Sequence, residues 1–297
     1  MGSAAYKQNG RGLQRAGGPR ILRGMSALDI AATVDMFATL AVEAGAAIMR
    51  VRAGDPQARL KADRSPVTDA DEAAERIILR GLAGARPHIP VVSEEAASRG
   101  EAPAIGPAFI LVDPLDGTRE FLAGNGEFTV NIALIVEGAP VGGVVYAPAL
   151  GLLWRGAAAR AARCDVLNHA PPSPQGWRPI RTRPRPTALV ALVSRSHPDA
   201  QSQAFLARLP VAERRCAGSS LKFCQIAEGL GDVYPRGGSI MQWDVAAGDA
   251  VLRAAGGLVV DEAGAPLRYG PAGGAHRVGP FVAWGDAEAA RTALTIA

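Results

Sequence analysis

Residues 109–118 (FILVDPLDGT) restrict the possible folds of this chain more than any other stretch. Their apolar start predicts a buried strand, which we expect to end at Pro114 because proline has no N–H for a central ladder. Asp113 and Asp116 lie on either side of that point. Two carboxylates held so close repel each other unless a cation lies between them. The stretch therefore predicts a strand end that holds a divalent cation.

The next two residues add a second property to this strand end. Gly117 allows a tight turn, so that the N–H groups of Gly117 and Thr118 can face an anion. A hard divalent cation beside such amides suits the hydrolysis of a phosphate ester. An ordinary turn is the commoner explanation of a lone Asp-Gly. Two further segments favour a cation site over an ordinary turn. VVSEE at 91–95 also ends in acids, and Trp243-Asp244 opens a predicted helix.

Three segments carry a resemblance to a known family. SEE at 93–95, DPLDGT at 113–118 and WDVAAG at 243–248 occur in the order found in the inositol monophosphatase-like superfamily. The similar region runs from about residue 27 to the C-terminus. The resemblance implies a magnesium-dependent, lithium-sensitive phosphomonoesterase. It also implies an α/β protein with the layered αβαβα fold of the sugar phosphatases.

The resemblance also implies the metal ligands and the catalytic residues. Oxygen-only donors favour Mg²⁺ or Mn²⁺ over Zn²⁺. Family members hold two or three ions on the positions that correspond to Glu94, Asp113, the Leu115 carbonyl, Asp116 and Asp244. Glu95 is expected to be a solvated neighbour. Asp71 and Thr118, with Glu94, are implied to be catalytic by orienting or deprotonating the attacking water. The Thr68-x-x-Asp71 pattern independently predicts a capping box at a helix start.

The second half of the chain is expected to select the substrate. Ser219, Lys222 and Arg236 are predicted to hold a second phosphate away from the metals, the first two at a helix N-terminus. SSLKFC at 219–224 and YPR at 234–236 resemble the 3′(2′),5′-bisphosphate nucleotidase branch. That resemblance places His197 near the nucleotide. The remaining predicted substrate contacts are Gly117, Thr118 and Asp244, and Asp244 is also expected to be the N-cap of its helix.

This branch implies removal of the 3′-phosphate from adenosine 3′,5′-bisphosphate, and from its sulfated form. Other phosphatases of the superfamily remain as alternatives, namely inositol monophosphatase, fructose-1,6-bisphosphatase and histidinol-phosphatase. A non-catalytic binding or regulatory protein on the same scaffold is an alternative of another class, since fold does not fix function. The loop at 237–242 (GGSIMQ) departs from the expected pattern and leaves the exact substrate open.

Composition separates a leader from two domains. Residues 1–25 are rich in Gly and Arg, contain no acid and predict a disordered basic leader. Without its five basic residues the chain has 27 Lys and Arg against 28 Asp and Glu, so we expect no nucleic acid binding by the folded part. We predict an N-terminal α+β metal-binding domain at 26–165. An α/β substrate-binding domain follows at 166–297, where strands and helices alternate.

The remaining expectations concern location and assembly. Three cysteines without metal-ligand spacing favour a reducing compartment. We found no apolar run near the ~20 residues of a transmembrane helix and therefore expect no transmembrane segment. The protein is expected to be cytoplasmic, or peripheral at the cytoplasmic face of the membrane. The resemblance further implies a homodimer, as in other family members.

Overall fold

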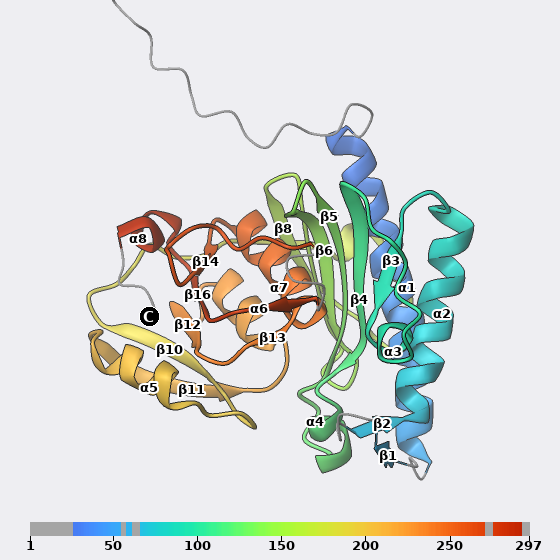
Figure 1. Ribbon diagram of the computed structural model, residues 1–297, viewed down its shortest axis with the longest axis horizontal. Helices are drawn as coiled ribbons and strands as arrows, with labels where there is room; N and C mark the ends of the chain where they lie inside the picture. The colour runs from blue at the N-terminus through green and yellow to red at the C-terminus, as the bar shows by residue number, and fades with distance from the viewer. Residues whose placement is uncertain (1–25, 55–57, 61–65, 271–275, 293–297) are drawn as a thin grey trace, which may run out of the picture.

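The computed structural model describes residues 26–54, 58–60, 66–270 and 276–292, and the leader predicted at 1–25 lies outside these ranges. Helices and sheets alternate in five layers (Figure 1). A helix pair covers a seven-stranded sheet, a second helix pair separates this sheet from a five-stranded sheet, and two short helices cover the outer face. The arrangement confirms the predicted αβαβα fold.

The elements have the following bounds. The helices are α1 (Ala27–Ala53), α2 (Asp69–Ala85), α3 (Glu94–Ser98), α4 (Thr118–Ala123), α5 (Ala200–Ala207), α6 (Leu221–Ala227), α7 (Gln242–Ala255) and α8 (Ala287–Thr292). The first sheet contains β3 (Val91–Ser93), β4 (Ala108–Asp116), β5 (Thr129–Val136), β6 (Ala139–Ala147), β7 (Leu152–Ala157), β8 (Arg160–Asp165) and β9 (Arg178–Ile180). The second contains β10 (Leu189–Ser194), β11 (Val211–Ala217), β12 (Val233–Arg236), β14 (Leu258–Asp261) and β16 (Phe281–Trp284). Two small ladders join β1 (Ala58–Leu60) to β2 (Pro66–Thr68) and β13 (Ile240–Met241) to β15 (Arg277–Val278).

The seven-stranded sheet is buried on both faces. Its strands follow chain order from β3 to β9, and only the β3–β4 pair is parallel. Successive residues of a strand point to opposite faces, so Ile132 belongs to the apolar cluster that contains Phe37 of α1, whereas Ala133 belongs to the cluster that contains Val251 of α7. The sheet therefore supplies the rigid wall from which the polar strand ends project.

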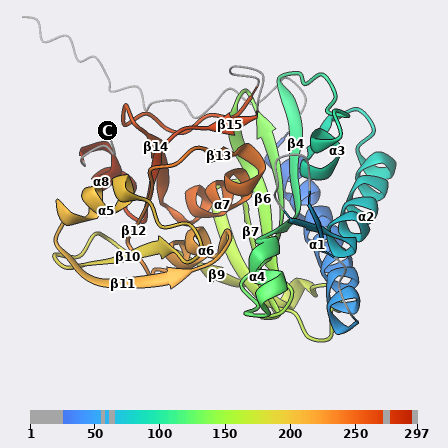
Figure 2. The ribbon, with the colours of Figure 1, turned by 60° about the horizontal axis from the view of Figure 1, so that its bottom comes forward.

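The five-stranded sheet has the order β11-β10-β12-β16-β14. Ala191 faces the outer helices with Phe205, whereas its neighbour Leu192 faces the layer of α6 and α7. Figure 2 shows the two sheets on either side of this middle layer. Because α6 and α7 contact both sheets, the loops at their N-termini lie where the two sheets meet.

Capping boxes begin two helices, and the one predicted at Thr68 is confirmed. Ser26 caps α1 and exchanges hydrogen bonds with Asp29, and Thr68 caps α2 in the same way with Asp71. Each capping box satisfies backbone N–H groups that the first turn leaves without partners. The box on α2 also fixes the Asp71 side chain in one orientation, which matters for the site described below.

The prediction of no transmembrane segment did not take helix α1 into account. By length and composition, Asp29–Ala53 is long and apolar enough to cross a membrane. However, 61% of its apolar window is buried, and the helix packs against α2 and β6. Its apolar side chains are therefore accounted for by the core of the fold.

Strand β4 does not end at Pro114, and that prediction was wrong. The strand continues to Asp116, which pairs with Thr129, and the register shifts between Asp113 and Asp116. Proline thus interrupts the ladder without terminating the strand, and the interruption turns both carboxylates toward the same edge. The first sheet also extends through β9 to Ile180, so the domain boundary at 165/166 stays a prediction.

Candidate metal and phosphate site

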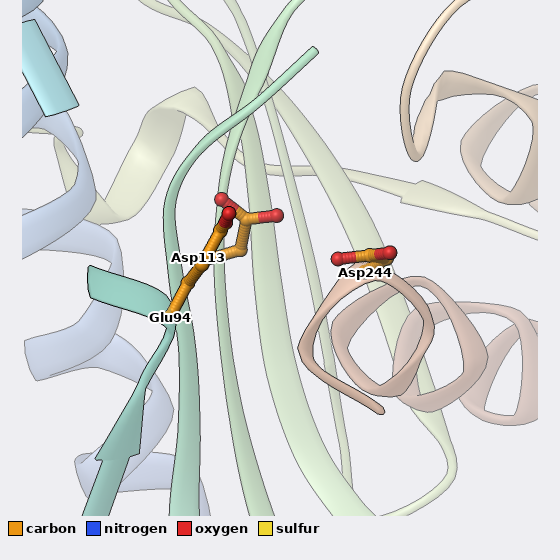
Figure 3. A group of neighbouring side chains, drawn as sticks. All are labelled: Glu94, Asp113 and Asp244. Atoms are coloured by element: carbon orange, nitrogen blue, oxygen red, sulfur yellow. The ribbon is translucent and has the colours of Figure 1, made fainter. Parts of the chain in front are cut away.

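Three acids from distant parts of the sequence meet at this edge. Glu94, Asp113 and Asp244 each offer one carboxylate oxygen (Figure 3), and these three oxygens lie within 4.8 Å of one another. Glu94 is the first residue of α3, directly after β3, and Asp113 lies in the neighbouring parallel strand β4. Asp244 approaches from the first turn of α7. The structure therefore brings together three of the four predicted carboxylate ligands.

Asp244 is not the N-cap of α7, and that prediction was wrong. Met241 is the N-cap, and Asp244 is the third helical residue, where its carboxylate accepts a hydrogen bond from the Met241 N–H at 3.2 Å. Glu95 also differs from expectation, because it is buried, with 3% of its surface exposed, and not solvated. The helix start still orients Asp244, because the backbone N–H holds its side chain.

The charges of this cluster fit a divalent cation. Burial raises the pKa of Asp244 well above its usual value, and the nearby negative charges of Asp116 and Glu94 raise it further. A buried group of mutually repelling carboxylates is stabilised when a cation replaces the bound proton. The donors are all oxygens, which suits a hard ion of the Mg²⁺ type. The cluster could therefore hold a metal ion.

Asp116 lies beside the cluster, and hydroxyl and amide groups hold its carboxylate. Its Oδ2 accepts hydrogen bonds from Ser219 Oγ at 2.6 Å and Ser220 Oγ at 3.2 Å. Asn131 Nδ2 and Thr129 Oγ1 contact the same oxygen at 3.3 and 3.5 Å. One carboxylate oxygen is thus fixed by groups from β5 and from the loop before α6, which leaves Oδ1 to serve as a ligand. The ligand role of Asp116 stays a prediction.

Asp71, Thr118 and the Leu115 carbonyl form a hydrogen-bonded unit at the end of β4. Asp71 is buried, and its Oδ2 accepts from both the N–H and the hydroxyl of Thr68 at 2.7 Å. Its Oδ1 accepts from Thr118 Oγ1 at 3.2 Å. The same hydroxyl lies 3.4 Å from the Leu115 carbonyl oxygen. The contact that the resemblance implied between Asp71 and Thr118 is therefore present.

The turn between β4 and α4 requires glycine. Gly117 has φ +90°, in the left-handed region that side chains disfavour. A Cβ atom at this position would lie 3.2 Å from Glu120 Oε2 and 3.4 Å from the Glu127 carbonyl oxygen. This conformation places the Gly117 and Thr118 backbone at the wall of the cavity that contains the acid cluster.

Two connected cavities occupy the space between the sheets. The first, of about 250 Å³, is lined by the acid cluster, the 115–120 turn, Ser194, His197 and Ser219. The second, of about 380 Å³, shares Glu94, Asp244 and four other lining residues with the first. It continues to Lys222, Phe223, Tyr234, Arg236, Ser239, Ile240, Met241, Trp243 and Arg277. An acidic end therefore opens directly into an end that carries arginines.

Three consecutive residues of the loop after β10 form polar contacts with the segment after β4. Arg195 pairs with Glu127 at 2.7 and 2.8 Å, and Ser196 hydrogen-bonds Glu120. His197 Nε2 lies 3.1 Å from Arg119 Nη1. Burial lowers the pKa of His197, and the positive charges of Arg236 and Arg119 lower it further. His197 therefore reaches the cavity as a neutral ring that can accept a hydrogen bond from Arg119.

Ser219 and Lys222, which were predicted to hold a second phosphate, make contacts that point to other roles. The Ser219 hydroxyl contacts Asp116, so it belongs to the acidic end of the cavity. Lys222 is buried, and its Nζ donates to the carbonyl oxygens of Ser219 at 2.7 Å and Ala217 at 3.1 Å. Nζ also lies 5.0 Å from the centre of the Tyr234 ring. The phosphate-binding roles of both residues stay predictions, and the contacts of Lys222 point first to holding the loop before α6.

The burial of Lys222 has a measurable consequence for stability. Burial lowers the pKa of Lys222 from an ordinary 10.5 to about 8. Between these two values the unfolded chain binds more protons at this site than the folded protein, so stability rises with pH. The unfolding free energy of the wild type, relative to Lys222→Met, should rise from pH 8 toward 9.5, by at most about 1.4 kcal/mol per unit. Urea denaturation of both proteins across this range tests the prediction, and parallel pH curves would contradict it.

Sequence reasoning missed several residues that line the cavities. Arg119 follows the DPLDGT segment directly, so its place in the chain offered a signal. Trp243 precedes Asp244 and lines the second cavity. Arg277 had no signal, because it belongs to no motif and reaches the cavity only through the pairing of β15 with β13.

Known proteins share this chain's sequence and fold. Residues 30–290 match the family model described as the inositol monophosphatase family. The 3′(2′),5′-bisphosphate nucleotidase CysQ of Escherichia coli K12 is 44% identical over 242 residues, which cover 80% of this chain and 94% of that protein. The crystal structure of CysQ from Bacteroides thetaiotaomicron superposes with a TM-score of 0.72 at 33% identity, over 88% of this chain and 99% of the other.

A relative named for another activity also matches. The histidinol-phosphatase of Mycobacterium tuberculosis is 35% identical over 243 residues, which cover 76% of this chain and 85% of that protein. These matches extend over most of each chain. The chain therefore belongs to the inositol monophosphatase family.

Proposed function

We propose that the protein is a Mg²⁺-dependent phosphomonoesterase that removes the 3′-phosphate from adenosine 3′,5′-bisphosphate, and from its sulfated form. The observation that carries the proposal is the acid cluster of Glu94, Asp113 and Asp244, which opens into a cavity lined by Arg236. The name of the 44% identical relative from Escherichia coli supports the same substrate. We further propose a cytoplasmic protein that acts on small phosphorylated molecules, without nucleic acid as a partner, and that forms homodimers.

Glu94, Asp113, Asp244, the Asp116 carboxylate and the Leu115 carbonyl would hold two or three divalent ions. A bound divalent cation supplies positive charge that polarises the phosphate and lowers the pKa of water. Thr118 donates to Asp71, which leaves the lone pairs of its hydroxyl free to accept a hydrogen bond from the attacking water. Asp71 is held by two further hydrogen bonds and can take up the Thr118 hydroxyl proton while that hydroxyl receives one from the attacking water. The Gly117 and Thr118 amides would hold the phosphate oxygens.

The arginines at the far end of the cavity favour a substrate with two anionic groups. Arg236 lines the second cavity and has no carboxylate partner among the ion pairs of the described residues. A guanidinium suits a phosphate better than an uncharged sugar hydroxyl. Because one relative is named a histidinol-phosphatase, a monophosphate is the second candidate substrate. A bisphosphate can place one phosphate at the acid cluster and the other near Arg236, whereas a monophosphate leaves Arg236 without an anionic partner.

A substrate panel with the purified full chain tests the proposal. Phosphate release from adenosine 3′,5′-bisphosphate should exceed release from inositol 1-phosphate, fructose 1,6-bisphosphate and histidinol phosphate. Chelation of the metal should lower the rate by at least about 100-fold, because the ions supply several kcal/mol of charge stabilisation. Added Mg²⁺ should restore the rate, and Li⁺ should inhibit it. Preference for another ester of the panel would contradict the substrate, and no release from any ester would contradict the activity.

A further inference from the structure

The arginine-lined end of the second cavity is built by a small ladder that no motif revealed. Strand β13 lies directly before α7, and β15 pairs with it so that Arg277 stands opposite Met241. Figure 2 shows this ladder beside the start of α7. The ladder carries Arg277 to the same cavity as Arg236 and Trp243. Two guanidinium groups thus share a cavity wall although they lie 41 positions apart in the sequence.

Arg277 is held in place by its neighbours without being neutralised. Its Nε donates to Ser239 Oγ at 3.1 Å and its Nη2 to the Ser239 carbonyl oxygen at 3.2 Å, while Nη1 contacts Met241 Sδ at 3.4 Å. A guanidinium has five N–H donors, so two remain for a ligand. None of the ion pairs found among the described residues includes Arg277. A pre-positioned, unpaired cation of this kind suits an anion.

Two buried donors in the same wall have no hydrogen-bond partner within the described part of the chain. The indole Nε1 of Trp243, a residue with 5% of its surface exposed, is buried and makes no hydrogen bond to any described residue. Arg236 Nε is likewise buried and has no partner among these residues. Buried polar groups are usually hydrogen-bonded, and an unsatisfied one costs about 1–3 kcal/mol. A ligand with acceptor oxygens in this cavity would satisfy both donors.

We propose that Arg277, with Arg236 and the Trp243 indole, binds the second, non-reacting phosphate of the substrate and makes Arg277 a specificity-determining residue. The proposal rests on the proposed function, because it assumes that the reacting phosphate occupies the acid cluster. The acids at one end would repel this second phosphate, and the arginines at the other would attract it. The cavity thereby orients a bisphosphate in a single direction, with only one of its esters beside Asp113.

Arg277→Gln tests this role with two substrates and one product. KM for adenosine 3′,5′-bisphosphate should rise roughly tenfold, since a charge-assisted hydrogen bond to an exposed group is lost. KM for adenosine 3′-monophosphate, which lacks the second phosphate, should stay unchanged. Adenosine 5′-monophosphate carries only the second phosphate, and its Kd, measured by isothermal titration calorimetry, should rise by a similar factor. Arg277→Lys should retain part of the affinity for both ligands that carry this phosphate.

Two further variants separate phosphate binding from the general loss of a surface arginine and from support of the 237–242 loop. Arg214→Gln removes a cation whose side chain, among the described residues, is hydrogen-bonded to Gln203, and it should leave both KM values nearly unchanged. Ser239→Ala keeps the charge of Arg277 but removes a hydroxyl that holds it, so it should raise KM for adenosine 3′,5′-bisphosphate less than Arg277→Gln does. Equal losses on both nucleotides, or the same loss in Ser239→Ala as in Arg277→Gln, would overturn the proposal. A wild type that hydrolyses neither nucleotide would overturn the proposed function, while the binding of adenosine 5′-monophosphate would still decide the role of Arg277.

Discussion

Replacement of Asp113 by asparagine is expected to lower kcat/KM by about a thousandfold or more, because it removes from the acid cluster a carboxylate that we propose as a metal ligand. Asp113 is buried, and its Oδ1 accepts a hydrogen bond from the Leu115 N–H at 3.0 Å. Asparagine keeps the size of the side chain and one acceptor oxygen, so the turn should persist. A loss of kcat/KM in Asp113→Asn would therefore reflect the missing charge and not a change in the fold.

The stability of the same variant should change in the opposite direction. In the absence of metal, removal of one of three carboxylates that meet within 4.8 Å relieves repulsion, so Tm in the presence of a chelator should rise. The increase in Tm that Mg²⁺ causes in the wild type should disappear, since binding to the folded state no longer stabilises it. Asp165→Asn, outside the cavities at the end of β8, is the matched control. It loses ion pairs with Arg163 and Arg178, which should lower Tm slightly, but the increase in Tm that Mg²⁺ causes should stay unchanged. A variant that keeps its response to Mg²⁺ would exclude Asp113 as a ligand.

The acidic end of the cavity could be predicted largely from the sequence. Apolar runs that end in acids indicated strand ends, and adjacent parallel strands carry Glu94 and Asp113 to the same edge. The approach of Asp244 could not be derived from local patterns, because it depends on α7 packing between the sheets. Only the resemblance to a family joined it to the other two acids, and the structure agrees. Motifs were informative here because each candidate ligand lies in the first turn of a helix or at the interruption near the end of β4.

The arginine-lined end could not be predicted in the same way. The SSLK pattern indicated a helix start, which the structure places at Leu221, but the direction of the Lys222 side chain depends on two carbonyls of the preceding loop. Strand β11 has an exposed, charged middle, so it lacks the alternation that indicates a strand. Arg277 reaches the cavity through a ladder between segments far apart in the chain. Such contacts are set by tertiary packing, which leaves no local signal.

Asp71→Asn is expected to lower kcat by about 10² to 10⁴, with little change in the affinity for Mg²⁺, because it alters the hydrogen bond that orients Thr118. The two oxygens of Asp71 accept on opposite sides, from Thr68 and from Thr118. Asparagine has only one acceptor oxygen. If that oxygen keeps the helix cap, its NH₂ group faces Thr118, whose hydroxyl must then accept the hydrogen bond and no longer donate it. The threonine could no longer accept a hydrogen bond from water in the same geometry.

Thr68→Ala separates this effect from the loss of the helix cap. The variant removes one hydrogen bond to Asp71 Oδ2 but leaves the Asp71–Thr118 contact, at a cost of about 1 kcal/mol in unfolding free energy. Single-turnover phosphate release should therefore be nearly normal in Thr68→Ala and strongly slowed in Asp71→Asn. Equal rates in the two variants would show that Asp71 acts only by starting α2. A slow Asp71→Asn that retains the Mg²⁺-dependent rise in Tm would instead place the defect in the positioning of Thr118, because the acid cluster would still bind its ion.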